Sequence, residues 1–173
     1  MSRNILVVNG HPDPRPERFC AALCDAYSQG AQARGCATRR LDVGTLRLPA
    51  AANDDPQAWS GIEAAYRLVR AADRLAIVYP LWANAPPSEL KQLFDYVARL
   101  RGRLDGFSAK TARLVVTTEL PAFLYRATQD RDAIALPGIQ AEMPTFIGSV
   151  DSISVEQRTR WLQEVRGFGA MAA

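Results

Sequence analysis

Residues 4–27, NILVVNGHPDPRPERFCAALCDAY, decide how this chain folds. The stretch opens with a short β-branched run, residues 4–10, which ends at a glycine and is typical of a strand buried on both faces. A proline-rich loop follows, and apolar residues then recur at the spacing of one helix face: Phe19, Ala22, Leu23, Ala26 and Tyr27. The pattern predicts strand, loop and helix, with Glu17 in the first helical turn and an end at Gly30 or Gly35.

The rest of the chain repeats this alternation of strand and helix. Further strands are expected at 37–43, 74–81, 112–118 and 145–150, the first of them at a sheet edge. The helices between and after them have apolar faces made by Trp59, Ile62, Tyr66 and Val69, by Leu90, Leu93, Phe94 and Val97, and by Trp161, Leu162, Val165 and Phe168. Asp55-Pro56 and the capping box Ser154–Gln157 predict where two of these helices begin.

Five strands alternating with helices call for a doubly wound α/β domain with a parallel sheet and helices on both faces. The length of 173 residues indicates one domain, residues 1–173. Five strands in this length favour the order 2-1-3-4-5, that of flavodoxin-like folds, over the dinucleotide-binding order.

Composition excludes several classes of function. The net charge is only +3 and the arginines are spread along the chain, so no nucleic-acid partner is expected. Cys20, Cys24 and Cys36 have no C-x-x-C spacing and His11 is the sole histidine, which argues against a zinc site or a disulfide framework. The longest mostly apolar stretch, 75–87, is too short to span a bilayer, so no membrane insertion is expected. Without a signal sequence at its start, the protein is expected to be cytoplasmic.

Two loops are the candidate binding site, because the switch point of this strand order lies between strands one and three. Loop 10–20 has three prolines, a histidine, arginines and a helix N-terminus, which favours an anion such as a phosphate. Loop 80–87 places Trp82 at the end of the most apolar strand. Each loop alone is equally typical of an ordinary strand-to-helix connection, but together they suit a phosphorylated planar heterocycle such as FMN.

The motifs in these loops resemble those of a known family. Gly10-His-Pro-Asp-Pro14, Arg18–Leu23 and Ile77–Trp82 are similar to motifs of the flavodoxin-like NAD(P)H:quinone oxidoreductases, which include the potassium-efflux ancillary proteins. The similarity continues through Val116–Arg126 and covers nearly the whole chain. The resemblance implies a homodimer with FMN or FAD that takes hydride from NAD(P)H. It would pass two electrons to a small aromatic substrate: a quinone, azo or nitro compound.

The resemblance also implies roles for individual residues. One group would surround the flavin phosphate: His11, Arg18, Phe19 and Cys20. Another would lie along the ring: Pro80, Leu81, Trp82, Ala83 and Asn84 on one side, with Thr117, Thr118, Glu119 and Leu120 on the other. Tyr125 would face the substrate.

Two departures from the family pattern open alternatives. Glu119 stands where the family typically has a glycine, and a carboxylate there would crowd the ring and repel the negative charge of reduced flavin. The segments 100–110 and 126–145, which help to cover the ring in relatives, are short. One alternative is therefore a flavin-free protein in which His11 and Glu119 carry out acid–base chemistry. Another is an accessory or regulatory binding protein.

Overall fold

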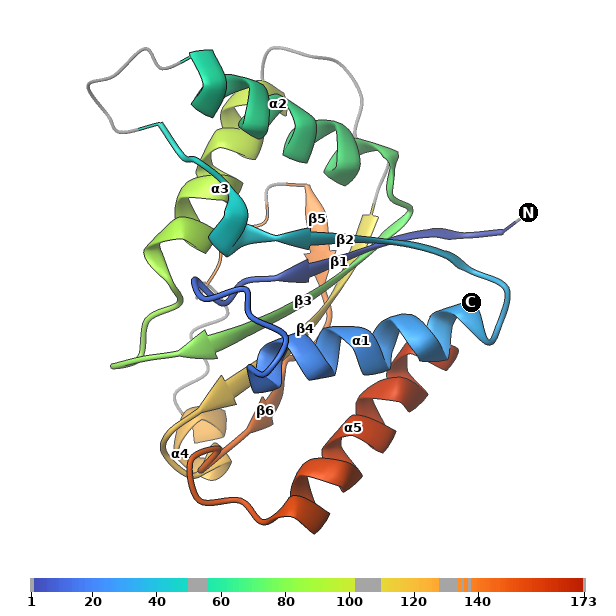
Figure 1. Ribbon diagram of the computed structural model, residues 1–173, viewed down its shortest axis with the longest axis vertical. Coiled ribbons are helices and arrows are strands. Elements are labelled where there is room, and N and C mark those ends of the chain that lie inside the picture. Colours follow the sequence, from blue (N-terminus) through green and yellow to red (C-terminus); the bar gives the residue numbers. More distant parts are fainter. Residues whose placement is uncertain are drawn as a thin grey trace.

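The computed structural model describes residues 2–49, 56–101, 110–127, 134, 136 and 138–172, and its central feature is a parallel sheet (Figure 1). The strands β1 (Asn4–Asn9), β2 (Ala37–Asp42), β3 (Arg74–Leu81) and β4 (Lys110–Thr118) lie in the order β2-β1-β3-β4, followed by β5. The order predicted from the sequence is confirmed. The carboxyl ends of β1, β3 and β4 therefore lie next to each other, which is where a ligand is expected.

Burial explains why these segments form strands. Within β1 and β3 every residue but the first is buried, as expected of central parallel strands covered on both faces. In β2 only Leu41 is fully buried, and this strand lies at the sheet edge, as its weak alternation predicted.

The fifth strand is divided, and here the prediction of one strand over 145–150 is wrong. The short strands β5 (Ile139–Ala141) and β6 (Thr145–Ile147) pair one after the other with β4, β5 near its start and β6 near its end. Pro144, which lies between them, has no N–H to donate to a sheet ladder. Beyond Ile147 the chain leaves the sheet, and Ser149 has a φ of +54°.

Ion pairs hold this interruption in place. The Glu142 carboxylate forms ion pairs with Arg74 and with Arg113, the latter at 3.2 Å, so it is tied to both β3 and β4. Its backbone N–H also donates to the Ala112 carbonyl at 2.8 Å. The chain between β5 and β6 therefore stays against the sheet although it is not a strand.

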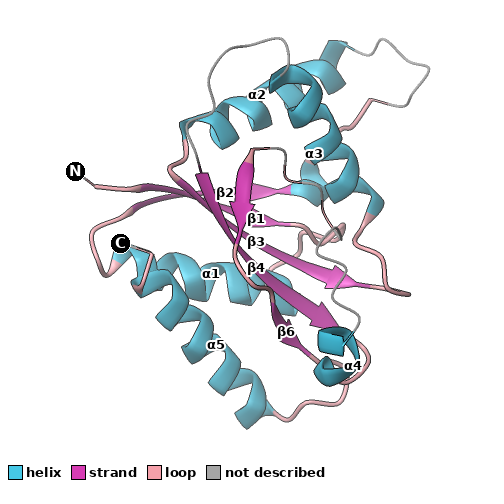
Figure 2. Ribbon diagram, turned by 180° about the vertical axis from the view of Figure 1, so that it is seen from behind, coloured by secondary structure: helices cyan, strands magenta, loops and turns pink. Residues whose placement is uncertain are grey.

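Helices cover both faces of the sheet (Figures 1 and 2). On one face lie α2 (Pro56–Ala71) and α3 (Ser88–Arg101), and on the other lie α1 (Phe19–Gln32) and α5 (Val155–Ala170). The structure adds a short helix that the sequence analysis missed, α4 (Ala122–Ala127), and the 3-10 turn Val43–Thr45. The capping box at Ser154 is present, whereas Asp55, the other predicted cap, lies outside the described residues. No helix in the described ranges is both long and apolar enough to cross a membrane.

Close packing of α1 on α5 depends on two glycines. A Cβ on Gly30 would collide with the Arg166 carbonyl, and one on Gly169 would collide with the Tyr27 carbonyl. Gly30 therefore lies inside α1 and does not end it; the chain turns after the helix at Gly35, whose φ is +81°. The expected start also needs correction, because α1 begins at Phe19, after Glu17.

Candidate functional site

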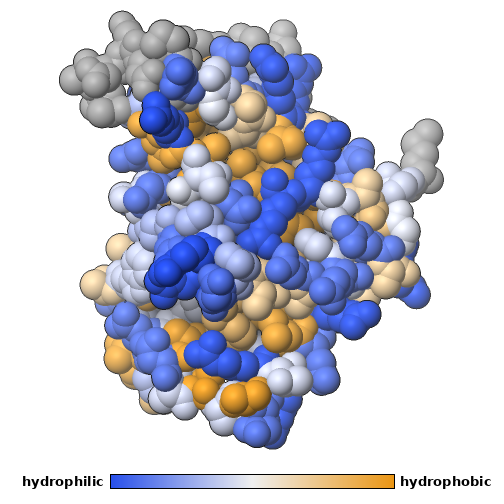
Figure 3. Space-filling model, in the orientation of Figure 1, coloured by the Kyte–Doolittle hydropathy of each residue, from blue (hydrophilic) through white to orange (hydrophobic). Residues whose placement is uncertain are grey.

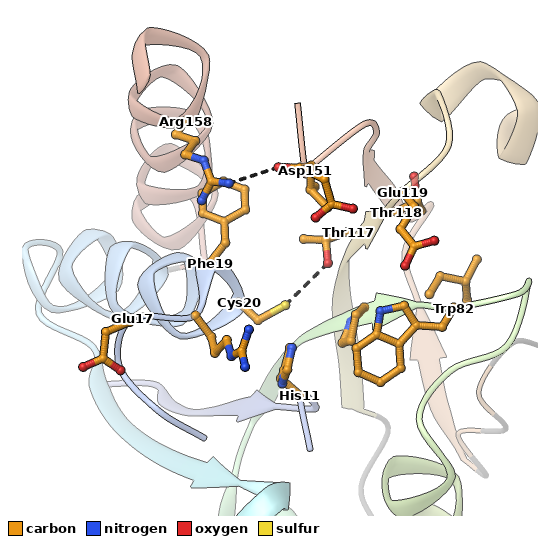
Figure 4. Close-up of a pocket in the computed structure, with 14 residues that line it drawn as sticks. His11, Glu17, Phe19, Cys20, Trp82, Thr117, Thr118, Glu119, Asp151 and Arg158 are labelled. Atoms are coloured by element: carbon orange, nitrogen blue, oxygen red, sulfur yellow. Dashed lines mark hydrogen bonds between the residues drawn. The ribbon is translucent and has the colours of Figure 1, made fainter. Parts of the chain in front are cut away.

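A cleft of about 260 Å³ opens at the carboxyl ends of the central strands (Figure 4). The two predicted loops meet there, joined by the ends of β4 and by the segment before α5. Ten predicted site residues line it: His11, Arg18, Phe19, Cys20, Pro80, Leu81, Trp82, Thr117, Thr118 and Glu119. Four further lining residues were not predicted: Glu17, Val150, Asp151 and Arg158. Glu17 belongs to the predicted loop 10–20, and for the other three the capping box at Ser154 is the sequence signal, because it places the start of α5 and the loop before it at the carboxyl edge of the sheet.

The start of α1 gives the cleft an anion-binding end. Its N-cap residue, Arg18, makes no side-chain cap hydrogen bond, and the first turn has no acidic residue. The amides of Phe19, Cys20 and Ala21 therefore have neither a helical carbonyl nor a capping side chain as acceptor. Such amides, together with the helix dipole, favour a phosphate or a similar anion.

Ion pairs and close packing fix the loop that leads into α1. The Asp13 carboxylate accepts hydrogen bonds from Arg15 Nε at 2.9 Å and from Arg18 Nε at 2.7 Å, which hold the pKa of Asp13 well below its usual range. Gly44 lies against the Pro12 carbonyl, so closely that a Cβ would collide with it. Because the guanidinium of Arg18 is bound to Asp13, the backbone amides are the main positive element at this end.

The His11 side chain reaches from this loop into the cleft (Figure 4). Its Nδ1 accepts a hydrogen bond from the Asp13 N–H at 2.9 Å, so the ring proton of the neutral form is on Nε2. Partial burial, and next the nearby Arg18 charge, lower the pKa of His11, while Asp13 acts in the opposite direction. The side chain therefore offers a hydrogen-bond donor that carries no charge at neutral pH.

Trp82 forms one wall of the cleft and is held by a tight turn. Its ring stands edge-on to that of His11, with 5.4 Å between the centroids, and the side chain is 41% exposed. Trp82 and Ala85 exchange two backbone hydrogen bonds, of 3.0 and 2.8 Å, across Ala83 and Asn84, whose φ values are +47° and +63°. The resemblance implied that Ala83 and Asn84 line the ring edge, but the structure places them in this turn, outside the cleft.

The floor of the cleft is made of side chains whose polar atoms are already bonded. Cys20 Sγ lies 3.5 Å from Thr117 Oγ1, and Thr118 Oγ1 donates to the Leu120 carbonyl at 2.7 Å. Burial raises the pKa of the Cys20 thiol to about 11, so it stays protonated at neutral pH. The Cys20 thiol is therefore not an activated nucleophile, and these residues shape the cleft.

Besides Ala83 and Asn84, two more of the expected residues lie outside the cleft. Leu120 is 51% exposed and Tyr125 is buried, and neither lines it. The Tyr125 ring stacks on Phe146 at a centroid distance of 5.9 Å, because α4 turns this face of the helix toward β6. The substrate-facing role that the resemblance implied for Tyr125 does not match this position.

The two charged residues Arg158 and Glu119, at the border of the cleft, differ in the contacts that they make. Arg158 donates to the Val150 carbonyl at 3.0 Å and lies over the Phe19 ring, 5.0 Å from its centroid (Figure 4). Glu119 is exposed and borders the cleft on the side of Trp82. Among the described residues, no hydrogen bond or ion pair joins Glu119 to His11 or to any cation.

A family model places this architecture among known proteins. The model for the flavodoxin-like fold matches residues 3–156, which is most of the chain. The chain belongs to this flavodoxin-like fold family. A cleft at the switch point of the sheet is where members of such folds bind ligands, so the position of the cleft agrees with the family.

Solved structures of this fold superpose on nearly the whole chain. One is an NAD(P)H:quinone oxidoreductase from Methanothermobacter marburgensis, with a TM-score of 0.75, 15% identity, and coverage of 99% of this chain and 98% of that one. Another is an FMN-dependent NADH-azoreductase from Bacillus anthracis str. Ames Ancestor in complex with FMN, with a TM-score of 0.65, 10% identity and full coverage of both chains. No curated protein is similar enough in sequence to match. At these identities the likeness establishes the fold alone.

Proposed function

We propose that the protein is a flavin-dependent NAD(P)H oxidoreductase that passes two electrons to a quinone, azo or nitro acceptor. The observation that carries this proposal is that the uncapped start of α1 and the wall formed by Trp82 belong to one cleft. A phosphorylated, planar aromatic ligand needs both features. The solved structures that share the fold include an NAD(P)H:quinone oxidoreductase and an FMN-dependent azoreductase, which adds support.

The residues of the cleft fit a flavin nucleotide. The first amides of α1 would bind the phosphate, with Arg18 beside them, and Trp82 with Pro80 and Leu81 would contact the ring. FMN or FAD would satisfy this arrangement. When bound, the flavin supplies the redox chemistry, accepting a hydride from NAD(P)H and giving two electrons to the acceptor. The chain itself binds and orients these molecules, and His11 offers its Nε2–H as a donor within the cleft.

The two alternatives have less support from the geometry. Acid–base catalysis by His11 and Glu119 would need the two groups to act on one substrate, yet among the described residues no hydrogen bond or ion pair links them. An accessory binding protein would not need the uncapped start of α1 to lie in a cleft. Neither alternative accounts for the cleft as well as a bound flavin does.

We further propose that the protein forms a homodimer, as the resemblance implies. Exposed apolar side chains support this: Leu120, Phe123 and Leu124 are 51%, 67% and 44% exposed. In Figure 3, hydrophobic side chains gather at the end of the molecule where Figure 1 shows α4 and β6. Sedimentation velocity would test this assembly, with a single monomer species at micromolar concentration as the contrary result.

Absorbance spectroscopy tests the redox proposal. We expect the protein, as isolated or after addition of FMN or FAD, to show flavin bands in the near ultraviolet and the blue that shift relative to free flavin. NADPH or NADH added without oxygen should then bleach the blue band. A colourless protein that takes up neither flavin on titration would refute the proposal.

A further inference from the structure

Glu119 lies at the Trp82 end of the cleft, and no ion pair among the described residues supplies it with an opposite charge. The phosphate end is at the start of α1, where Arg18 is the N-cap residue and Glu17 precedes it. At the other end Glu119 borders the cleft on the side of Trp82 (Figure 4). A ligand whose phosphate binds the α1 amides has its ring extending toward Trp82, and therefore toward this carboxylate.

The other charged groups of the cleft do not neutralise Glu119. Arg18 is paired with Asp13, with 2.7 Å between Nε and the carboxylate. Arg158 is bonded to the Val150 carbonyl and lies over Phe19, on the α1 side of the cleft. Asp151, which also borders the cleft, adds a second negative charge. His11 is neutral because of its lowered pKa.

We propose, on the basis of the proposed flavin function, that Glu119 makes the cleft discriminate between the two redox forms of flavin, binding the oxidised form more tightly than the two-electron reduced form. The oxidised ring is neutral, whereas the reduced ring carries a negative charge near neutral pH. A fixed carboxylate at the ring end repels only the charged form. The α1 amides bind the phosphate equally in both forms, so they contribute affinity but no discrimination.

The size of the effect follows from Coulomb's law. Two unit charges about 5 Å apart in a water-like dielectric repel by an amount that changes an equilibrium constant roughly fourfold, and a lower effective dielectric increases this. Glu119 is exposed, so the water-like limit applies. The ratio of the two dissociation constants, reduced over oxidised, should therefore fall about fourfold on removal of the charge. For a two-electron couple this corresponds to a rise of about 18 mV in the potential of bound flavin.

The test is equilibrium binding, independent of turnover. Oxidised FMN and dithionite-reduced FMN are each titrated anaerobically into the protein, Glu119→Gln and the matched control Glu17→Gln. We expect Glu119→Gln to tighten binding of reduced FMN about fourfold with little effect on oxidised FMN. Because Glu17 is at the phosphate end, Glu17→Gln should change both affinities by the same factor and leave their ratio unchanged.

The outcomes separate this inference from the function on which it rests. If the unaltered protein binds neither form of FMN, the flavin proposal fails and this one fails with it. If both forms bind but Glu119→Gln leaves their affinity ratio unchanged, the flavin proposal stands and the role of Glu119 is refuted. A ratio that changes equally in both variants would also refute it, because the effect would then come from the total charge of the cleft.

Discussion

A pair of substitutions at Arg18 tests whether the start of α1 binds the flavin phosphate. Arg18 is the N-cap residue, with extended backbone (φ −71°, ψ 138°), and its side chain does not cap the helix. Asparagine is short enough to accept a hydrogen bond from the amide of Cys20 or Ala21, whereas glutamine is too long to do so. Arg18→Asn therefore fills the proposed anion site with the protein's own acceptor, and Arg18→Gln leaves that site open.

The expected magnitudes follow from the contacts of Arg18. Both variants lose the Arg18–Asp13 ion pair, whose side chains are 46% and 25% exposed, so each loses no more than about 1 kcal/mol. The cap then makes Arg18→Asn more stable than Arg18→Gln by about 1 kcal/mol. A phosphate must displace this cap before it can bind, so Arg18→Asn should bind FMN roughly fivefold more weakly than Arg18→Gln does.

Denaturant unfolding measures the first difference, and titration of FMN fluorescence measures the second. Equal FMN affinity in the two variants, with the asparagine variant clearly more stable, would show that the phosphate binds elsewhere. Equal stability would show that the amides already have an acceptor.

Three further predictions concern the glycines, the turn after Trp82 and His11. Gly30→Ala should destabilise the protein by about 1–3 kcal/mol in denaturant unfolding, because the new Cβ collides with the Arg166 carbonyl. Gly167→Ala, which meets nothing within 4 Å, should instead stabilise it by about 0.5–1 kcal/mol. Ala83→Gly should raise stability by about 0.5 kcal/mol, since glycine accepts the φ of +47° freely, and an unchanged or lower unfolding midpoint would contradict this. The His11 imidazole should titrate with a pKa below 6.5 in an NMR experiment, and a pKa above 6.5 would contradict this. Because the unfolded chain then binds the proton more readily than the folded protein does, the free energy of unfolding should fall as the pH drops below 6.5.

The centre of the sheet was predictable because β1 and β3 are buried on both faces and are therefore largely apolar. The predicted strand 74–81 has the same bounds as β3, because a buried parallel strand is a continuous apolar run in the sequence. The divided edge strand was not predictable. Its halves, β5 and β6, have three residues each, and they are held by pairing with β4, a contact between distant parts of the chain that leaves no periodic pattern in the sequence. The short α4 was missed for the same reason.

The candidate site was partly predictable. The carboxyl ends of parallel strands meet at one edge of the sheet, so the sequence alone predicts that the two loops and the end of β4 lie close together. The orientation of some side chains was not predictable: Tyr125 points into the core because of how α4 packs on β6, and Ala83 adopts a left-handed backbone conformation that few residues favour. Asp151 lies in the loop between β6 and α5, and Arg158 lies in the first turn of α5, so the positions of both depend on where the divided edge strand ends.

The divided edge strand also makes aggregation through this edge of the sheet less favourable. An outermost strand normally presents a row of free N–H and C=O groups, onto which a strand of another molecule can add and begin aggregation. Here each half offers only three residues, and Pro144 and the charged side chain of Glu142 separate the halves. The discontinuity that made this part of the chain difficult to predict therefore means that, among the described residues, β5 and β6 do not form one continuous template for a further strand at this edge.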